Sequence, residues 1–202
     1  MQILIASDIH ANFSALQKLE KDIIQSDYIF FLGDFIGYNP EANEVINYVK
    51  TLDNCYCLMG NHDYYLIHND TNSVNDRVRQ WIQYTQKIIS PENLNWLKNL
   101  PTQLSLTIHS IKFLLQHGSP ENPLFEYIYP DSKKFNALFE LNYDIICMGH
   151  THHYLQKEKG KKIILNPGSV GQPRDDRTQI SYCIYHLHNL ETNRIEHKKI
   201  AL

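Results

Sequence analysis

Five short polar motifs recur along the 202-residue chain, and each directly follows a run of apolar residues. Short continuous apolar runs are typical of strands that are covered on both faces. Where such strands alternate with helices they lie parallel, and ligands gather at their carboxyl ends. The motifs are Asp8-Ile9-His10, Gly33-Asp34, Gly60-Asn61-His62-Asp63, His117-Gly118 and Gly149-His150-Thr151-His152. A fold that satisfies this pattern places the motifs together at the ends of its strands.

The first half of the chain predicts alternating strands and helices, followed by a helical segment. Strands are expected over 2–7, 28–32 and 54–59, and helices over 13–23 and 42–49. Apolar residues at helical spacing then predict a helix from Val74 to Ile88. A second helix is expected after Ser90-Pro91, where serine can cap the helix and proline suits its first position. This segment, about 64–100, forms either a lid over the site or a packed flank.

The second half of the chain is expected to be mostly β-structure. Strands are predicted over 104–108, 111–116, 144–148, 154–158, 163–166, 180–186 and 194–199, with a helix around 135–139. Two sheets packed face to face with helices outside are the predicted architecture. We expect a single domain over 1–202, with the helical insertion at about 64–100, because a chain of this length can bury one good core.

Charge and cysteine content narrow the classes of partner. The formal net charge of -3 argues against a broad basic face, so nucleic acid is an unlikely partner. Four cysteines lie in strand-like runs without a Cys-x-x-Cys pair, which predicts buried, reduced thiols. Met1 is followed at once by the first strand, and no apolar run approaches the roughly 18 residues that span a bilayer. We therefore expect a cytoplasmic protein with no membrane partner.

The motifs offer oxygen and imidazole donors without a thiolate, as expected for divalent ions in hydrolytic chemistry. Asp8 and His10 can converge on one ion, and Asp34 can bridge two cations that lie about 3.5 to 4 Å apart. Asn61 suits a ligand, and His62 suits a general acid. Each motif has an ordinary alternative, such as a helix cap, a Gly-Asp turn or a structural histidine. Five of the eleven histidines fall in the motifs, however, which favours a metal site.

The same motifs, in this order, resemble the signature of the calcineurin-like metallophosphoesterase superfamily. The chain is most similar to its small single-domain prokaryotic branch, through the stretches 33–40, 117–120 and 166–174. The resemblance implies an α/β fold, a four-layer α/β/β/α sandwich of two mixed sheets. It also implies one ion held by Asp8, His10, Asp34 and His152, and a second held by Asp34, Asn61, His117 and His150.

One stretch departs from the related protein phosphatases, which carry Gly-Asp-x-Val-Asp-Arg-Gly. This chain has Gly37 and Tyr38 in place of the second aspartate and the arginine. His62 therefore lacks the usual aspartate partner, and protein dephosphorylation in that style is not expected. Tyr38, Asn39 and Arg174 are the candidate substrate contacts, although arginines with aspartates beside them, as Arg174 has, are more often in solvated pairs.

The resulting hypothesis is a dinuclear metal-dependent phosphoesterase. It would hydrolyse phosphodiesters, or phosphomonoesters, by attack of a metal-bridging hydroxide, with His62 as general acid. Diesters are favoured because no arginine clamp for a dianionic monoester is evident. The substrate is expected to be a small phosphoester or nucleotide-like molecule. Mn²⁺ is the favoured ion, with Fe, Ni, Co and Zn left open. A metal-dependent nuclease and a noncatalytic binding scaffold are the alternatives, and the oligomeric state stays open.

Overall fold

A computed structural model of the protein describes residues 1–72, 74–187 and 194–202. The helices are α1 Phe13–Gln17, α2 Glu20–Gln25, α3 Ala42–Val49, α4 Asn61–His68, α5 Asp76–Ile88, α6 Pro91–Lys98 and α7 Phe135–Glu140. The strands are β1 Gln2–Ala6, β2 Tyr28–Phe31, β3 Cys55–Cys57, β4 Gln103–Ile108, β5 Ile111–Gln116, β6 Ile145–Cys147, β7 Tyr154–Lys159, β8 Lys162–Pro167, β9 Gln179–His186 and β10 Arg194–Ala201.

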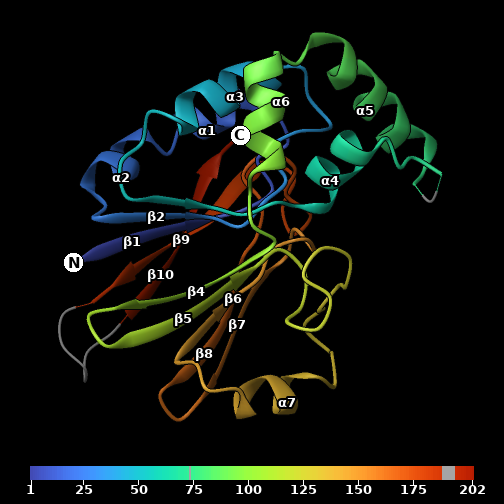
Figure 1. The fold of residues 1–202 in the computed structure, drawn as a ribbon. Coiled ribbons are helices and arrows are strands. Elements are labelled where there is room, and N and C mark those ends of the chain that lie inside the picture. The colour runs from blue at the N-terminus through green and yellow to red at the C-terminus, as the bar shows by residue number, and fades with distance from the viewer. Residues whose placement is uncertain (73, 188–193) are drawn as a thin grey trace.

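Two mixed five-stranded sheets form the centre of the molecule (Figure 1). The first sheet has the order β10-β9-β1-β2-β3. Its strands β1, β2 and β3 are parallel to one another, β9 is antiparallel to β1, and β10 is antiparallel to β9. In the second, with the order β4-β5-β6-β8-β7, the three central strands are parallel and both edge strands are antiparallel. The predicted architecture of two mixed sheets is confirmed.

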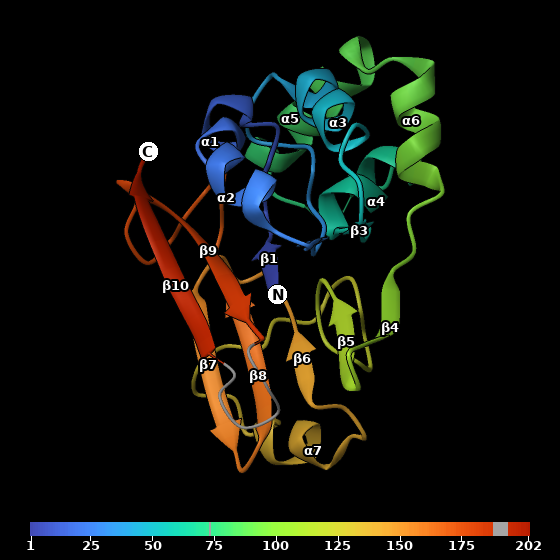
Figure 2. The same ribbon diagram turned by 90° about the vertical axis from the view of Figure 1, so that its left-hand side faces the viewer.

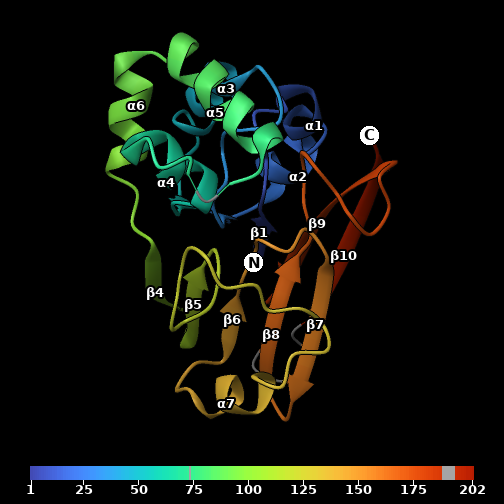
Figure 3. The ribbon, with the colours of Figure 1, turned by 90° about the vertical axis from the view of Figure 1, so that its right-hand side faces the viewer.

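The side-chain alternation of β1 shows how the layers are held together. Leu4 and Ala6 pack on the helical side of the first sheet, whereas Ile3 and Ile5 face the second sheet. A separate core cluster joins α7 to the outer face of the second sheet, through residues such as Leu138. The order of the layers is therefore helices, sheet, sheet, helix (Figure 1). In Figures 2 and 3 the helices α1 to α6 lie in the upper part of the view and α7 lies at the bottom.

The helices α5 and α6 match the two helices that were predicted after Val74 and after Ser90-Pro91, whereas α4 was not predicted. Ser90 caps α6 with its side chain and Pro91 is the first helical residue, as expected. Val78 and Ile82 of α5 are buried in the same core cluster as α1 and α3, so this segment is packed against the first sheet. The single-domain organisation stays a prediction.

Three local predictions were wrong or incomplete. The helix expected over 13–23 is divided into α1 and α2, because the amides of Lys18 and Leu19 bond to carbonyls only three residues back and tighten the turn. The third motif was read as a turn, but Gly60 is an N-cap and α4 begins at Asn61. Cys55, on the edge strand β3, is half-buried rather than buried, as is Cys57.

The remaining two cysteines are buried as predicted, and all four are free. Within the described parts of the chain, none of the helices combines the length and the apolar character needed to cross a bilayer.

Candidate metal centre

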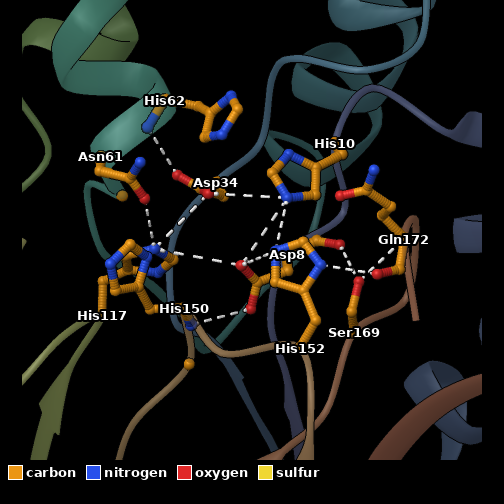
Figure 4. Close-up of polar contacts among 12 residues, drawn as sticks. Asp8, His10, Asp34, Asn61, His62, His117, His150, His152, Ser169 and Gln172 are labelled. Carbon is orange, nitrogen blue, oxygen red and sulfur yellow. Dashed lines mark hydrogen bonds and ion pairs between the residues drawn. The ribbon is translucent and has the colours of Figure 1, made fainter. Parts of the chain in front are cut away.

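The fold brings all seven predicted ligands to one place, between the carboxyl ends of strands from both sheets (Figure 4). Asp8 follows β1, Asp34 follows β2, and Asn61 begins α4 after β3. The second sheet contributes His117 after β5, and His150 and His152 after β6. Each of these side chains is at most 5% exposed. Residues that are more than 140 positions apart in the chain therefore lie in one buried cluster.

Five of the seven have left-handed backbone conformations, with φ angles of 56° at Asp8, 50° at His10, 58° at Asp34, 67° at His150 and 60° at His152. Such conformations cost roughly 1–3 kcal/mol each for residues other than glycine and tend to occur at functional sites. These residues lie in the loops that follow the strands, where the strained backbone turns their side chains toward the cluster. The surrounding contacts must therefore offset this local cost.

Asp8, His10, Asp34 and His152 form the first group, in which one ligand atom from each residue lies within 4.8 Å of all the others. The Nε2 atom of His10 is 3.1 Å from Nε2 of His152 and 3.6 Å from Oδ2 of Asp34. Nε2 of His152 is also 3.2 Å from Oδ1 of Asp8. Two imidazole nitrogens and two carboxylate oxygens thus point at the same small volume.

The hydrogen bonds of the first group decide which nitrogens can bind an ion. His10 donates from Nδ1 to the Ile36 carbonyl oxygen at 3.0 Å, and His152 donates from Nδ1 to the Gln172 carbonyl oxygen at 2.6 Å. Burial lowers the pKa of His10 well below its usual value, despite the opposing charge of Asp34. A neutral His10 with its proton on Nδ1 has a lone pair on Nε2, which faces other acceptors. This arrangement fits a divalent cation.

Asn61, His117 and His150 form the second group, together with Asp34. Nε2 of His117 is 3.0 Å from Oδ1 of Asn61 and 3.5 Å from Oδ2 of Asp34. Nε2 of His150 is buried and has no hydrogen-bond partner among the described residues, and the His150 ring lies 4.8 Å from that of His117. A buried nitrogen without a partner is costly unless something else binds it. The second group therefore also fits a cation.

Asp34 stands between the two groups. Its Oδ1 accepts the backbone N–H of His62 at 2.8 Å, while Oδ2 faces His10 of one group and His117 of the other. Gly60 leaves room for this carboxylate, because a Cβ atom at that position would lie 2.1 Å from Asp34 Oδ1. No other residue type fits there without a displacement of the backbone.

The charges of the two groups act on each other. Burial opposes ionisation of Asp34, but the neighbouring histidines outweigh it and hold the pKa of Asp34 well below its usual value. Burial also opposes protonation of His117, yet Asp34 and Asp8 raise the pKa of His117 to about 9. His150 responds in the opposite sense, since burial and the charge of His117 lower its pKa to about 3.

His62 belongs to neither group. Its side chain is 4% exposed, and within the part of the chain that the structure describes its Nδ1 atom has no hydrogen-bond partner. Gly37, which stands where the related phosphatases carry aspartate, explains this: a Cβ atom at Gly37 would lie 2.6 Å from His62 Nδ1. The ring instead packs between His10 and Tyr38, with centroid distances of 4.8 and 4.9 Å. Burial lowers the pKa of His62.

Asp63 was not singled out from the sequence, although it is part of the third motif. Its carboxylate is fully buried and accepts the backbone N–H groups of Gly60, Asp34, Phe35 and Ile36, at 2.9 to 3.2 Å. This clamp ties the start of α4 to the loop after β2 and so positions Asp34. An aspartate at the third position of a helix, after a glycine cap, was the available signal.

A cavity of about 280 Å³ opens onto the cluster. Beyond Asp34, Asn61, His62, His150 and His152, it is lined by Tyr38, Tyr65, Val74, Asn75, Val78, Tyr127 and Arg174. Two of the three predicted substrate contacts, Tyr38 and Arg174, are therefore on its wall. Asn39 is not: its side chain donates to the His10 carbonyl oxygen at 2.9 Å and holds the loop. Tyr127 stacks on His150, with ring centroids 3.7 Å apart.

Comparison with known proteins agrees with this picture. The model of the calcineurin-like phosphoesterase superfamily domain matches residues 1–190. A crystal structure of a metallophosphoesterase from Sphaerobacter thermophilus superimposes with a TM-score of 0.83 at 29% identity, over 99% of this chain and 88% of that one.

Two curated relatives were also compared. An uncharacterised protein of Methanocaldococcus jannaschii is 35% identical over 91% of this chain and 82% of its own length. A symmetrical bis(5'-nucleosyl)-tetraphosphatase of Erwinia tasmaniensis is 28% identical over 50% of this chain. The latter match spans only 39% of that enzyme.

Proposed function

This chain belongs to the calcineurin-like phosphoesterase superfamily and is a metal-dependent hydrolase of phosphoric esters, and from that premise we propose a dinuclear phosphodiesterase. The observation that carries the proposal is the position of Asp34 Oδ2, at 3.6 Å from His10 Nε2 and 3.5 Å from His117 Nε2. A carboxylate between two sets of ligands is what a bridged pair of ions requires.

In this proposal Asp8, His10, Asp34 and His152 hold one ion, and Asp34, Asn61, His117 and His150 hold the other. When bound, divalent ions at such a site supply Lewis-acid chemistry and lower the pKa of water toward neutrality. Mn²⁺ is the ion we favour, and the carboxylate, amide and imidazole donors also suit Fe²⁺, Co²⁺, Ni²⁺ and Zn²⁺. The backbone hydrogen bonds of His10, His117 and His152 hold the three rings in their ligand orientations.

His62 is assigned as the general acid that protonates the leaving oxygen. It lines the cavity, lies beside both ligand groups and is not itself needed as a ligand. Burial lowers its pKa in the free protein, and a phosphate anion in the cavity would oppose that shift by favouring the protonated ring. The absence of a carboxylate at position 37 leaves the Nδ1 atom of His62 to be held by packing alone.

The walls of the cavity support a small, nucleotide-like substrate. Tyr38, Tyr65 and Tyr127 offer aromatic surface on which a base can stack, and Arg174 offers one positive charge. The relative from Erwinia tasmaniensis is named for action on a bis(5'-nucleosyl) tetraphosphate, which is also a nucleotide-like substrate. A single arginine beside the ligands suits the single charge of a diester.

We propose the cytoplasm as the location, since its reducing conditions suit four free cysteines.

The test begins with metal-free protein that is loaded with Mn²⁺ in parallel with Fe²⁺, Co²⁺, Ni²⁺ and Zn²⁺. We expect two ions per chain by elemental analysis, and turnover of bis(p-nitrophenyl) phosphate that exceeds turnover of p-nitrophenyl phosphate. The metal-free protein is the control. A loaded protein that hydrolyses neither ester would refute the proposal, and cleavage of a labelled oligonucleotide in preference to both would indicate a nuclease instead.

A further inference from the structure

We call the cavity that opens onto the ligand cluster the catalytic cavity. A second cavity of about 280 Å³ lies beside it. Three arginines line it: Arg77 from α5, and Arg174 and Arg177 from the loop between β8 and β9. We call it the arginine cavity. Arg174 lines both cavities, so the two are joined at that side chain. The remainder of the lining is contributed by the segment 171–173 and by Leu202.

No carboxylate in the described part of the chain neutralises any of the three arginines. Among the described residues, no ion pair within 4.0 Å involves Arg77, Arg174 or Arg177. The sequence had suggested pairing of Arg174 with the aspartates that follow it, and that alternative was wrong. Asp175 binds His153 and the backbone N–H of Tyr154, and Asp176 binds Thr178. Neither aspartate is among the residues that line the arginine cavity.

Tyr38 connects the arginines to the catalytic cavity. The Arg77 guanidinium lies over the Tyr38 ring, 5.3 Å from its centroid, and Tyr38 lines the catalytic cavity. Burial raises the pKa of Tyr38, although the charges of Arg174 and Arg77 oppose the shift. Both guanidinium groups are therefore close enough to act on one tyrosine at the boundary of the two cavities. A molecule long enough to reach from the ligand cluster to the arginines would pass Tyr38.

We infer that the arginine cavity binds a second phosphate group of the substrate, so that the preferred substrate is a phosphoester that carries a distal phosphate or a short polyphosphate chain. The word substrate here rests on the proposed function. Arginine has a planar fork of donors that matches phosphate oxygens. Three guanidinium groups that have no carboxylate partner among the described residues surround one cavity, and they form a site for several negative charges. A substrate with only one phosphate would leave this cavity unused.

The experiment measures binding without catalysis. Metal-free protein, dialysed free of chelator, is titrated with tripolyphosphate and, separately, with orthophosphate in low salt by calorimetry. Without metal the ligand cluster carries the Asp8 and Asp34 carboxylates and offers a polyanion little, so binding reports on the arginines. We expect tripolyphosphate to bind more tightly than orthophosphate. Arg177→Gln and Arg77→Gln should each weaken tripolyphosphate binding about tenfold or more, since each removes a charge-assisted contact.

Arg194→Gln is the matched control, because Arg194 is exposed on β10 and does not line either cavity. It removes the same charge and should leave the dissociation constant unchanged. Melting curves of all three variants establish that they are folded. The inference is overturned if metal-free protein does not bind tripolyphosphate, or if the control weakens binding as much as Arg177→Gln does. Because no turnover is measured, a failure of the hydrolysis test leaves this result separately readable.

Discussion

The two groups of buried ligands share Asp34 but differ in charge. The first group contains a second carboxylate, Asp8, whose pKa is held below its usual value by His152 and His117 in spite of burial. The second group adds only the Asn61 amide and two imidazoles. The pKa of one of these imidazoles, His117, is raised to about 9, chiefly by Asp34. The two groups have similar geometry, but we expect them to bind metal ions with unequal affinity.

In the proposed dinuclear centre, this difference predicts that the two ions are not equivalent. The first ion should bind to a preformed pair of carboxylates, whereas the second must displace the proton of His117 before that imidazole can act as a ligand. Occupancy of the second position should therefore depend more strongly on pH and on the supply of metal.

Asp34→Asn removes the charge that both groups share and should have the largest effect. Asparagine keeps the shape and an acceptor for the His62 backbone N–H, so the fold should survive. We expect kcat/KM to fall by roughly 10⁴-fold or more, beyond the loss of a general acid alone, with fewer than two ions per chain by elemental analysis. Asp53→Asn, at an exposed position, is the control. A variant that retains both ions and its activity would break the idea of a shared carboxylate.

His62→Gln tests the residue that lies outside both groups. The metal content should be unchanged, while kcat should fall roughly 10²- to 10⁴-fold, as for loss of a well-placed acid. The loss should be greater for esters with a poor alkoxide leaving group than for nitrophenyl esters, whose leaving group needs less protonation. Equal losses for both kinds of ester would exclude the general-acid role and leave a positioning role.

Metal titrations between pH 6 and pH 9 sharpen the comparison of the two groups directly. Asp34 raises the pKa of His117 to about 9, so below that pH the second ion must release the proton of His117. Its apparent affinity should rise by about tenfold per pH unit up to about pH 9 and then level off. The first ion, bound by a neutral His10, should show a weaker slope. His117→Gln should abolish the steep phase, and equal slopes for both ions would contradict the assignment.

Gly37→Ala should have the smallest effect, because it displaces His62 but removes no ligand. Gly37 has a φ of 96°, and a Cβ atom there would meet His62 Nδ1 at 2.6 Å. We expect a loss of about 1–3 kcal/mol in the free energy of unfolding from this overpacking. Gly160→Ala shares a positive φ, 61°, but has open space around it and should lose less. Denaturant unfolding measures both, and equal losses would mean that backbone strain alone accounts for the effect.

Much of the fold could be predicted because its signals are local. The apolar runs before Asp8, Asp34 and His117 identify strands, and the Ser90-Pro91 pair identifies the start of α6. The sequence could not predict where the chain turns sharply between elements. The division of α1 from α2 and the start of α4 at Asn61 depend on individual hydrogen bonds that no periodicity encodes.

The candidate site divides in the same way. Which residue types gather, and after which strands, follows from motifs that each occupy a few consecutive positions, because strand ends are set by local apolar pattern. Whether they meet in usable geometry depends on contacts between distant segments: the Asp63 clamp on the loop after β2, the carbonyls that orient three imidazoles, and the stacking of Tyr127 on His150. The meeting of Arg77 with Tyr38 belongs to the same class. Local sequence thus specified the donors and where strands follow one another along the chain. Long-range packing set the charge balance and the cavities, because both depend on which distant groups share a low-dielectric interior.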